Sequence, residues 1–402
     1  MNRKEFLRQS SVLGLGAAFF GSLLSSCSKE YLTTLGDFDV NFSGDVLIIG
    51  AGSAGLTAGH LLKQYGIDFQ ILEASGDFGG RVKQIEGFAD FPIDLGAEWI
   101  HTDPGILARL LNDPQVDANI DLITYQPEEI YLWKDDKLKR RNIYSHFYSE
   151  YKFKSTTWYS FFRDYMVPGF ADRIQYNNPV AEIDYTGPRV SVRTVNGDTY
   201  TADKVIVTVP LSILQQEAIT FIPGMPTTKT DAINSVEFPD GIKIFVAFEE
   251  QFYPDMVYVG GLSDILSGDD KTIYDAAFRK DAEQPVLGLF TAGETATPYT
   301  SLGSDEAIIN SYMDELDTIF DGKASRYYQR HVVQNWSAEP FIQGSYSFHS
   351  SGYLDTISTL LEPLEQKVYF AGEAMNEDGN TSTVHGAGES AFQVVKRMLQ
   401  AG

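Results

Sequence analysis

The segment from Asp45 to Val82 constrains the fold more than any other part of the 402-residue chain. It begins with a short apolar run typical of a buried parallel strand, and Gly50-x-Gly52-x-x-Gly55 follows at once. A helical pattern comes next, and a second apolar run ends at an acidic residue, Glu73, near the expected spacing of about 20 residues. This order of strand, glycine-rich turn, helix and strand predicts a βαβ unit that binds a dinucleotide.

The residue types of this unit suit a pyrophosphate and a ribose. Glycines permit the tight turn and let the backbone approach the phosphates closely. The free N–H groups at the start of the following helix face the anion. Glu73 is then placed to accept hydrogen bonds from a pair of ribose hydroxyls.

The residues after Glu73 distinguish between dinucleotides. A second glycine pair, Gly79 and Gly80, precedes Arg81 in the stretch EASGDFGGRV. Here the chain resembles the flavin-containing amine oxidase family, which includes monoamine and polyamine oxidases, L-amino acid oxidases and flavin histone demethylases. In that family the corresponding segment lies beside the FAD pyrophosphate, so the resemblance implies FAD rather than a nicotinamide cofactor.

Three later stretches resemble the same family in the same order. Residues 94–101 match the segment that runs past the flavin ring, and residues 335–346 match the W-x-x-x-P-x-x-x-G-S-Y signature. FAGE at residues 370–373 and VHGA at residues 384–387 match the block beside the ribityl chain and the flavin pyrimidine. A further stretch, residues 178–211, resembles the family's second FAD-binding block, in which a valine at the place of Val180 meets the adenine through its backbone. The expected FAD-binding residues are therefore Gly50, Gly52, Ser53, Ala54, Gly55, Glu73, Ala74, Gly79, Gly80, Arg81, Gly96, Ala97, Glu98, Trp99, Val180, Pro210, Trp336, Gly372, Glu373, Thr383 and Val384.

Two residues are candidates for a catalytic role. Lys243 lies in the otherwise apolar run GIKIFVAF (241–248), where an unpaired buried lysine is costly. The run resembles a family strand whose lysine holds a water against flavin N5, which implies that role for Lys243. Tyr346 stands where the family has one tyrosine of an aromatic cage, and Thr383 replaces the second. Ser345 stands where monoamine oxidases have the cysteine that bonds the flavin, so FAD is expected to bind non-covalently.

The chain is long enough for two interleaved domains. The resemblance implies an α/β fold, in which a glutathione-reductase-type FAD-binding domain is interleaved with an α+β substrate domain made of a mixed sheet flanked by helices. We expect the FAD-binding domain in three parts, residues 44–103, 172–215 and 341–402. Between residues 104 and 171 the periodicity turns helical and aromatic residues crowd a short span, so this stretch is expected to form a helical segment of the substrate domain. Residues 216–340 are expected to form its main part.

Composition limits the partners. The 55 acidic residues against 31 basic ones give a net charge of −24, which repels nucleic acid and anionic membranes. A high acidic content is also solubilising. The single cysteine, Cys27, excludes a disulfide framework and a cysteine-based metal site. No nucleic-acid partner and no metal are expected, and the oligomeric state does not follow from the sequence.

Residues 1–27 have the pattern of an export signal, with a basic start followed by an apolar run too short to span a membrane. Leu24-Ser25-Ser26-Cys27 resembles a lipobox, which implies a lipid anchor on Cys27. The basic start resembles a twin-arginine signal with lysine as its second basic residue, so both export routes stay open. We expect an exported protein, anchored to a bacterial membrane through residues 28–43 as a tether; an ordinary cleaved signal is the alternative.

The resemblance implies an FAD-dependent enzyme that oxidises the C–N bond of an amine by hydride transfer to flavin N5. Its partners would be a small-molecule amine and oxygen, and its products an imine or aldehyde, ammonia or amine, and hydrogen peroxide. An L-amino acid oxidase, which needs a basic anchor for the substrate carboxylate, stays open. So do a non-amine flavin desaturase or oxidase of the same fold and a non-catalytic flavin-binding surface protein.

Overall fold

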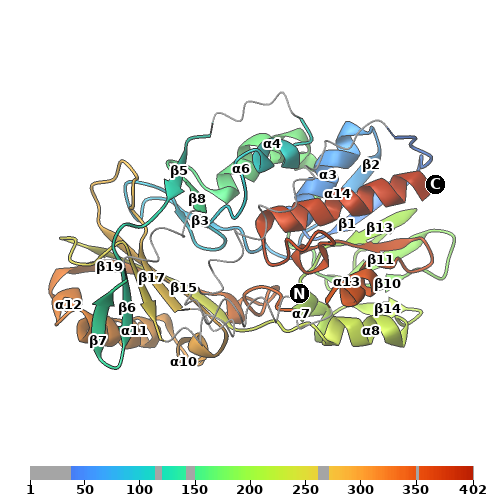
Figure 1. Cartoon of the computed structure of the whole chain (residues 1–402). Helices are drawn as coiled ribbons and strands as arrows, with labels where there is room; N and C mark the ends of the chain where they lie inside the picture. The colour runs from blue at the N-terminus through green and yellow to red at the C-terminus, as the bar shows by residue number, and fades with distance from the viewer. Residues whose placement is uncertain (1–37, 114–119, 142–149, 261–270, 350–352, 402) are drawn as a thin grey trace, which may run out of the picture.

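The computed structural model describes residues 38–113, 120–141, 150–260, 271–349 and 353–401. These residues form two lobes, each built around its own sheets (Figure 1). The predicted export signal, the lipobox with Cys27 and most of the predicted tether lie outside the described residues. No helix in the described ranges has the length and apolar character needed to cross a membrane.

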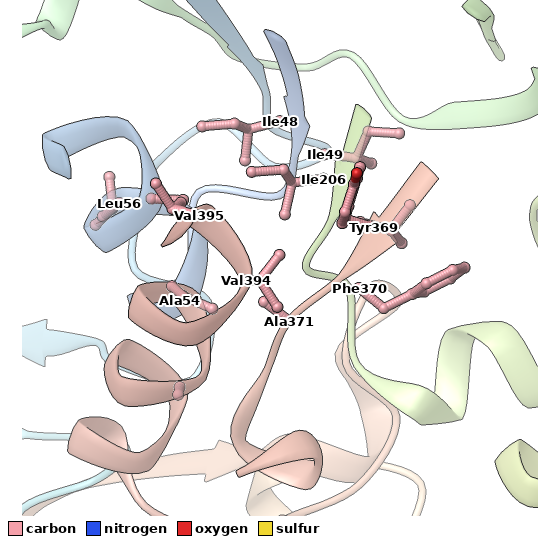
Figure 2. Packing of buried hydrophobic residues seen from close by; sticks show 14 of the residues in the cluster. Ile48, Ile49, Ala54, Leu56, Ile206, Tyr369, Phe370, Ala371, Val394 and Val395 are labelled. Carbon is pink, nitrogen blue, oxygen red and sulfur yellow. The ribbon is translucent and has the colours of Figure 1, made fainter. Parts of the chain in front are cut away.

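The first lobe contains a parallel sheet of five strands in the order β20-β13-β1-β2-β9. β1 pairs with β2 on one side and with β13 on the other, as expected for a dinucleotide-binding unit. The helices α3 and α14 pack against each other beside this sheet, and Figure 2 shows Val394 and Val395 of α14 near Ala54 and Leu56 of α3. The bounds are β1 Asp45–Ile49, β2 Asp68–Leu72, β9 Ile174–Gln175, β13 Lys204–Val207, β20 Val368–Phe370, α3 Ser53–Gln64 and α14 Val384–Ala401.

A four-stranded sheet in the order β12-β11-β10-β14 completes the first lobe. Its first three strands form an antiparallel meander. The fourth strand, β14, runs parallel to β10. The bounds are β10 Val180–Asp184, β11 Val190–Thr194, β12 Thr199–Ala202 and β14 Thr220–Ile222.

The second lobe is built on a mixed sheet of seven strands in the order β19-β15-β18-β17-β16-β6-β7. Strand β15, which lies between β19 and β18, is buried along its whole length, and successive side chains point to opposite faces. Ile242, Ile244 and Val246 pack with helix α11 on one face, while Phe245 and Ala247 belong to a separate cluster on the other. Lys243 therefore points toward the face that carries Phe245. The bounds are β6 Ile130–Lys134, β7 Lys137–Arg140, β15 Gly241–Phe248, β16 Met256–Val259, β17 Lys271–Asp275, β18 Val286–Ala292, β19 Tyr328–Asn335 and α11 Asp305–Ile319.

Shorter elements connect these sheets. The strands are β3 Gln84–Ile85, β4 Ile93–Asp94, β5 Leu122–Tyr125 and β8 Glu150–Phe153, and they pair as β3 with β4 and β5 with β8. The helices are α4 Ile106–Leu110, α6 Trp158–Tyr165, α7 Leu211–Gln215, α8 Thr227–Asn234, α10 Thr297–Thr300, α12 Lys323–Tyr327 and α13 Tyr353–Leu361. Single 3-10 turns lie at η1 Val167–Gly169, η2 Ala171–Arg173, η3 Gly293–Thr295, η4 Trp336–Ala338 and η5 Glu373–Met375.

The prediction of a helical substrate segment at residues 104–171 is wrong. This stretch contains the strands β5 to β8 as well as α4 and α6. β6 and β7 form a hairpin through Asp135 and Asp136, whose φ angles of 52° and 51° match a tight two-residue turn. The two helices pack in the core of the first lobe instead of the second. Aromatic residues that suggested helical periodicity, such as Trp158 and Phe161, fill that core.

The predicted domain boundary at residue 216 also differs from the structure. β14 completes the meander sheet, and α8 packs against α7 and α13. Residues up to the end of α8 therefore belong to the first lobe. The second lobe begins near β15, because only there does the chain enter the seven-stranded sheet.

Candidate functional site

A cavity of about 850 Å³ runs between the two lobes. At one end it is lined by the turn between β1 and α3, and at the other by β15, β18 and the residues before α14. Its walls include both candidate catalytic residues, Lys243 and Tyr346, and all the expected FAD-binding residues except Gly55. Segments far apart in the sequence thus meet at one site.

The glycine-rich turn forms one end of this cavity. Gly50 has a φ of 103°, a conformation that favours glycine, and a Cβ on Gly55 would lie only 1.9 Å from the Gly50 carbonyl oxygen. Gly55 therefore lets α3 start directly against the turn, although it does not itself line the cavity. The nearest atom to a Cβ on Gly52 would be the Gly79 carbonyl oxygen at 3.9 Å, so Gly52 leaves open space at the start of α3.

Glu73 lies at the end of β2, where its carboxylate is 7% exposed. Its Oε2 accepts a hydrogen bond from the Ala51 N–H at 2.6 Å, and its Oε1 accepts from the Ser75 N–H at 2.8 Å and hydroxyl at 2.7 Å. The backbone of the glycine turn is thereby tied to the end of the second strand. Glu73, Ala74 and Val180 line the cavity together, which places the predicted ribose and adenine contacts at the same end.

An ion pair joins the first and last parts of the first lobe. Arg81 Nη1 lies 2.9 Å from Glu373 Oε1 and also donates to the Ser345 carbonyl at 3.0 Å. Glu373 further accepts from the N–H and hydroxyl of Ser347 and from the Ser382 N–H. Arg81 and Glu373 thus hold the cavity wall together. That Glu373 also contacts hydroxyl groups of the cofactor is a prediction.

The segment Gly96–Trp99 forms the floor between the two ends. A Cβ on Gly96 would lie 1.8 Å from the Arg81 carbonyl oxygen, so only glycine permits this approach. Trp336 donates from Nε1 to the Leu95 carbonyl at 3.1 Å and is 5% exposed, which fixes the segment against the second lobe. Glu98 turns its carboxylate away from solvent toward Lys243.

Lys243 is 2% exposed and uses every N–H of its ammonium group. Nζ donates to the carbonyls of Asp94 and Gly96, both at 3.0 Å, and to Glu98 Oε2 at 2.7 Å. Burial lowers the pKa of Lys243 and the Glu98 carboxylate opposes that shift. Because three acceptors require three donors, the group is an ammonium here. A hydrogen bond from Nζ to a water, which the resemblance implies, would have to replace one of these three.

The wall opposite the glycine turn is aromatic. Tyr346 stacks on Phe290 of β18, with ring centroids 6.3 Å apart and an interplanar angle of 26°. The neighbouring Ser345 donates its hydroxyl to the Pro239 carbonyl at 3.0 Å. Thr383 caps the first turn of α14, since its hydroxyl oxygen accepts from the Gly386 N–H at 2.9 Å.

Two comparisons of the sequence bear on this geometry. The model of the family described as flavin containing amine oxidoreductase matches residues 169–399, which is more than half of the chain. The chain belongs to this family. A second model, described as an NAD(P)-binding Rossmann-like domain, matches residues 48–113, where the glycine turn and Glu73 lie.

Relatives of this family member include demethylases and oxidases. The chain is 27% identical to lysine-specific histone demethylase 1B of Mus musculus, over 82% of this chain and 50% of that protein. It is 25% identical to polyamine oxidase 3 of Oryza sativa subsp. japonica, over 85% of this chain and 86% of that protein. The chain thus spans half the length of the mouse demethylase.

A solved structure supports the fold of the family member. It is a putrescine oxidase mutant from a structure-based redesign of cofactor binding, and it matches with a TM-score of 0.73 over 90% of this chain and 100% of that one. The sequences are 15% identical, so this likeness concerns the fold. It agrees with the predicted α/β architecture of interleaved FAD-binding and substrate domains.

The cavity fits FAD, the cofactor of the family. Its volume lies within the usual range for ligand sites, about 300–1,000 Å³. The open space at Gly52 and the start of α3 suit the pyrophosphate, because free N–H groups of a helix N-terminus bind anions. Glu73 and Val180 mark the adenosine end, and the rest of the cavity extends past Gly96 to Lys243.

Sequence reasoning missed three residues at this site. Phe290 lines the cavity beside Tyr346, and Glu150 lines it 3.2 Å from Nδ1 of His101. Lys152 does not line the cavity but contacts Glu98 behind it. The alternation of Glu150 and Lys152 in the β8 stretch EYKF was a usable signal, since both charged residues point to one face of a strand.

His385 predicts a pH dependence of stability. Its ring is 3% exposed, and burial lowers its pKa from the usual 6.5 to about 3. Below pH 6.5 the unfolded chain takes up this proton and the folded chain does not, so stability should fall as the pH falls from 6.5 toward 3. Between pH 7 and pH 5 we expect this group to cost about 2 kcal/mol in the free energy of unfolding.

Equilibrium urea unfolding of the wild type and the His385→Gln variant at pH 7 and pH 5 measures this effect. The variant should lose less stability than the wild type over that range. Equal losses in the two proteins would show that His385 does not carry the acid sensitivity.

Proposed function

We propose that the protein is an FAD-dependent amine oxidase. The observation that carries this proposal is the single cavity that extends from the glycine turn to Lys243 and Tyr346, in a chain of the flavin amine oxidoreductase family. Bound FAD supplies an acceptor for the hydride that leaves the carbon next to the amine nitrogen, with oxygen as the proposed final acceptor. The imine left by this loss is hydrolysed to a carbonyl compound and ammonia or an amine.

The residues of the chain bind and orient the substrate in this proposal. Tyr346 and Phe290 offer an apolar wall that excludes water, which favours the neutral amine that reacts. The Lys243 ammonium adds positive charge at the wall, which also disfavours a protonated amine beside it. The pair His101 and Glu150 brings a carboxylate to the same cavity.

An L-amino acid oxidase is the second candidate, and the cavity argues against it. Such an enzyme needs a basic side chain that is available to the substrate carboxylate. Among the described residues that line the cavity, each basic side chain already faces a carboxylate of the protein: Arg81 faces Glu373, Lys83 faces Glu339, His101 faces Glu150 and Lys243 faces Glu98. A monoamine, diamine or polyamine fits these pairings better.

Peroxide release tests the proposal directly. The FAD-loaded protein should release hydrogen peroxide with at least one compound from a panel of mono-, di- and polyamines, and not with amino acids. Anaerobic bleaching of the flavin by the same compound separates substrate oxidation from the reaction with oxygen. A panel in which only amino acids bleach the flavin would favour the second candidate.

Non-covalent attachment of FAD gives a further expected result. Ser345 has no thiol with which to bond the flavin, and its hydroxyl already donates to the Pro239 carbonyl. Acid or heat should therefore release all the yellow colour from the denatured polypeptide. Flavin fluorescence that stays with the polypeptide band on a denaturing gel would contradict this.

We further propose that the protein is exported and lipid-anchored through Cys27. The support is the sequence of residues 1–27, with its basic start, short apolar run and lipobox-like end. In a bacterial host, the Cys27→Ser variant should lose lipid labelling and move from the membrane fraction to the soluble exported fraction. A variant that stays in the membrane fraction would contradict the anchor, and an unprocessed precursor in a twin-arginine-deficient host would identify the export route.

A further inference from the structure

Glu98 is shared by two buried lysines. Its Oε2 accepts from Lys243, and its Oε1 forms an ion pair with Lys152 of β8. Tyr274 of β17 donates its hydroxyl to Oε2 as well. Lys152, Lys243 and Glu98 are 1%, 2% and 4% exposed, so the three charges lie in the protein interior.

An aromatic cage holds Lys152. Its Nζ lies 5.1 Å from the ring centroid of Trp99, 4.6 Å from that of Tyr125 and 4.9 Å from that of Tyr274. Ring faces attract a cation, and this attraction grows when water is excluded. Glu98 and the three rings together fix the Lys152 ammonium behind the cavity wall.

The cluster carries an excess of positive charge. Two ammonium groups share one carboxylate, which leaves a net charge of +1. Asp94 does not cancel it, because burial and the nearby Glu98 raise its pKa to about 8 and keep its carboxyl protonated near neutral pH. Tyr125 and Tyr274 stay neutral, since burial raises the pKa of both. Burial lowers the pKa of Lys280 to about 8, and its positive charge is offset by Asp275, whose pKa burial raises only to about 6, so the net charge of +1 stands.

Stability alone does not account for the second lysine. Burying a charge costs several kcal/mol, and one lysine would neutralise Glu98. The excess charge instead lies next to the cavity, since Glu98, Trp99 and Lys243 line it while Lys152 stands directly behind them. A dinucleotide with its adenosine end at Glu73 extends its other end along this wall, because the cavity continues from there to Lys243.

We propose that Lys152 is a positioning residue of the flavin site, which through Glu98 fixes Lys243 at the cavity wall and gives that wall its net positive charge. This inference rests on the proposed FAD site and adds a role that depends on charge. Reduction adds electrons to the flavin, and nearby positive charge stabilises the electron-rich form. Lys152 therefore raises the reduction potential of bound FAD without touching it.

The test is a redox titration of the FAD-loaded protein with dithionite and a reference dye. Lys152→Met keeps an apolar side chain of similar length in the cage and leaves Glu98 paired with Lys243. We expect its FAD reduction equilibrium to shift at least tenfold toward the oxidised form, which is 29.6 mV for a two-electron couple. FAD affinity should stay within about threefold of the wild type, since Lys152 does not line the cavity.

Two matched variants separate charge from packing. Tyr274→Phe removes a hydrogen bond to Glu98 but no charge, so it should keep the wild-type potential. The double variant Glu98→Gln with Lys152→Met removes one negative and one positive charge together, and so keeps the net charge of +1. It should recover most of the potential that Lys152→Met loses.

A Lys152→Met protein that binds FAD with the wild-type potential would overturn the inference. An equal shift in Tyr274→Phe would also overturn it, because packing would then explain the effect. If the Lys152→Met protein does not retain FAD, the Glu98→Gln single variant is titrated instead. It removes a negative charge from the cluster, so its FAD must have a higher reduction potential than FAD in the wild type. The titration needs no substrate. An absence of amine oxidation would therefore refute the proposed function without affecting the measured reduction potential of bound FAD.

Discussion

Replacement of Lys243 by methionine should leave the protein folded and loaded with FAD, and should slow flavin reduction by substrate, reoxidation by oxygen, or both. Methionine preserves length and apolar packing in β15. Glu98 keeps Lys152 as an ionic partner, so the substitution does not leave a buried carboxylate without a partner of opposite charge. Loss of a preorganised positive charge at a reacting site commonly costs on the order of 10²-fold in rate, and we expect at least that.

Stopped-flow measurement of the two half-reactions shows which step slows. The matched control is Lys229→Met: this buried lysine donates to the carbonyls of Leu360 and Glu362 at 2.7 Å, and it does not line the cavity. The control should lose stability and keep both rates. If the Lys243→Met protein runs both half-reactions at wild-type rates, Lys243 is only a structural ion-pair partner of Glu98.

The substitution Gly52→Ala should abolish tight FAD binding without unfolding the protein. A Cβ at this position meets no protein atom closer than 3.9 Å, so the apoprotein accommodates it. The methyl group nevertheless occupies the open space at the start of α3, where the backbone must approach the pyrophosphate. We expect FAD affinity to fall by at least about 100-fold, or roughly 2.7 kcal/mol.

Fluorescence titration of the apoprotein with FAD measures this loss, and urea unfolding of the same apoprotein checks the fold. Gly303→Ala is the matched control, because a methyl group on this exposed glycine would meet no atom within 4 Å and the residue lies in the second lobe. It should bind FAD as the wild type does. Wild-type affinity in Gly52→Ala would show that the pyrophosphate does not lie at this turn.

Local sequence pattern is sufficient to predict the dinucleotide-binding unit. The run from Asp45 to Glu73 predicts β1, α3 and β2, and these elements form within a few residues of the expected bounds. The reason is that each part depends on a short-range pattern, an apolar run, a glycine spacing or a helical period. The same holds for β15 and for the strand before Gly372.

The membership of the site also follows from the sequence, through the resemblance of motifs spread along the chain. Gly96, Lys243 and Tyr346 lie in segments whose order predicts one cofactor site, and all three line the cavity. Local pattern was less informative between residues 104 and 171. There, aromatic spacing suggested helices, whereas β6 pairs with the distant strand β16 and β7 pairs with β6 as a hairpin.

The contacts of Lys243 and Glu98 become known only from the packing of the folded chain. The sequence places Lys243 in an apolar strand and Glu98 beside Trp99, but it cannot pair them across 145 positions or bring Lys152 to the other oxygen of Glu98. The partner of a buried charge depends on how the sheets pack, because the interior must satisfy that charge from whichever elements lie against it. Local pattern therefore predicted the elements and the motifs, and the packing of the two lobes determined the charge of the wall between them.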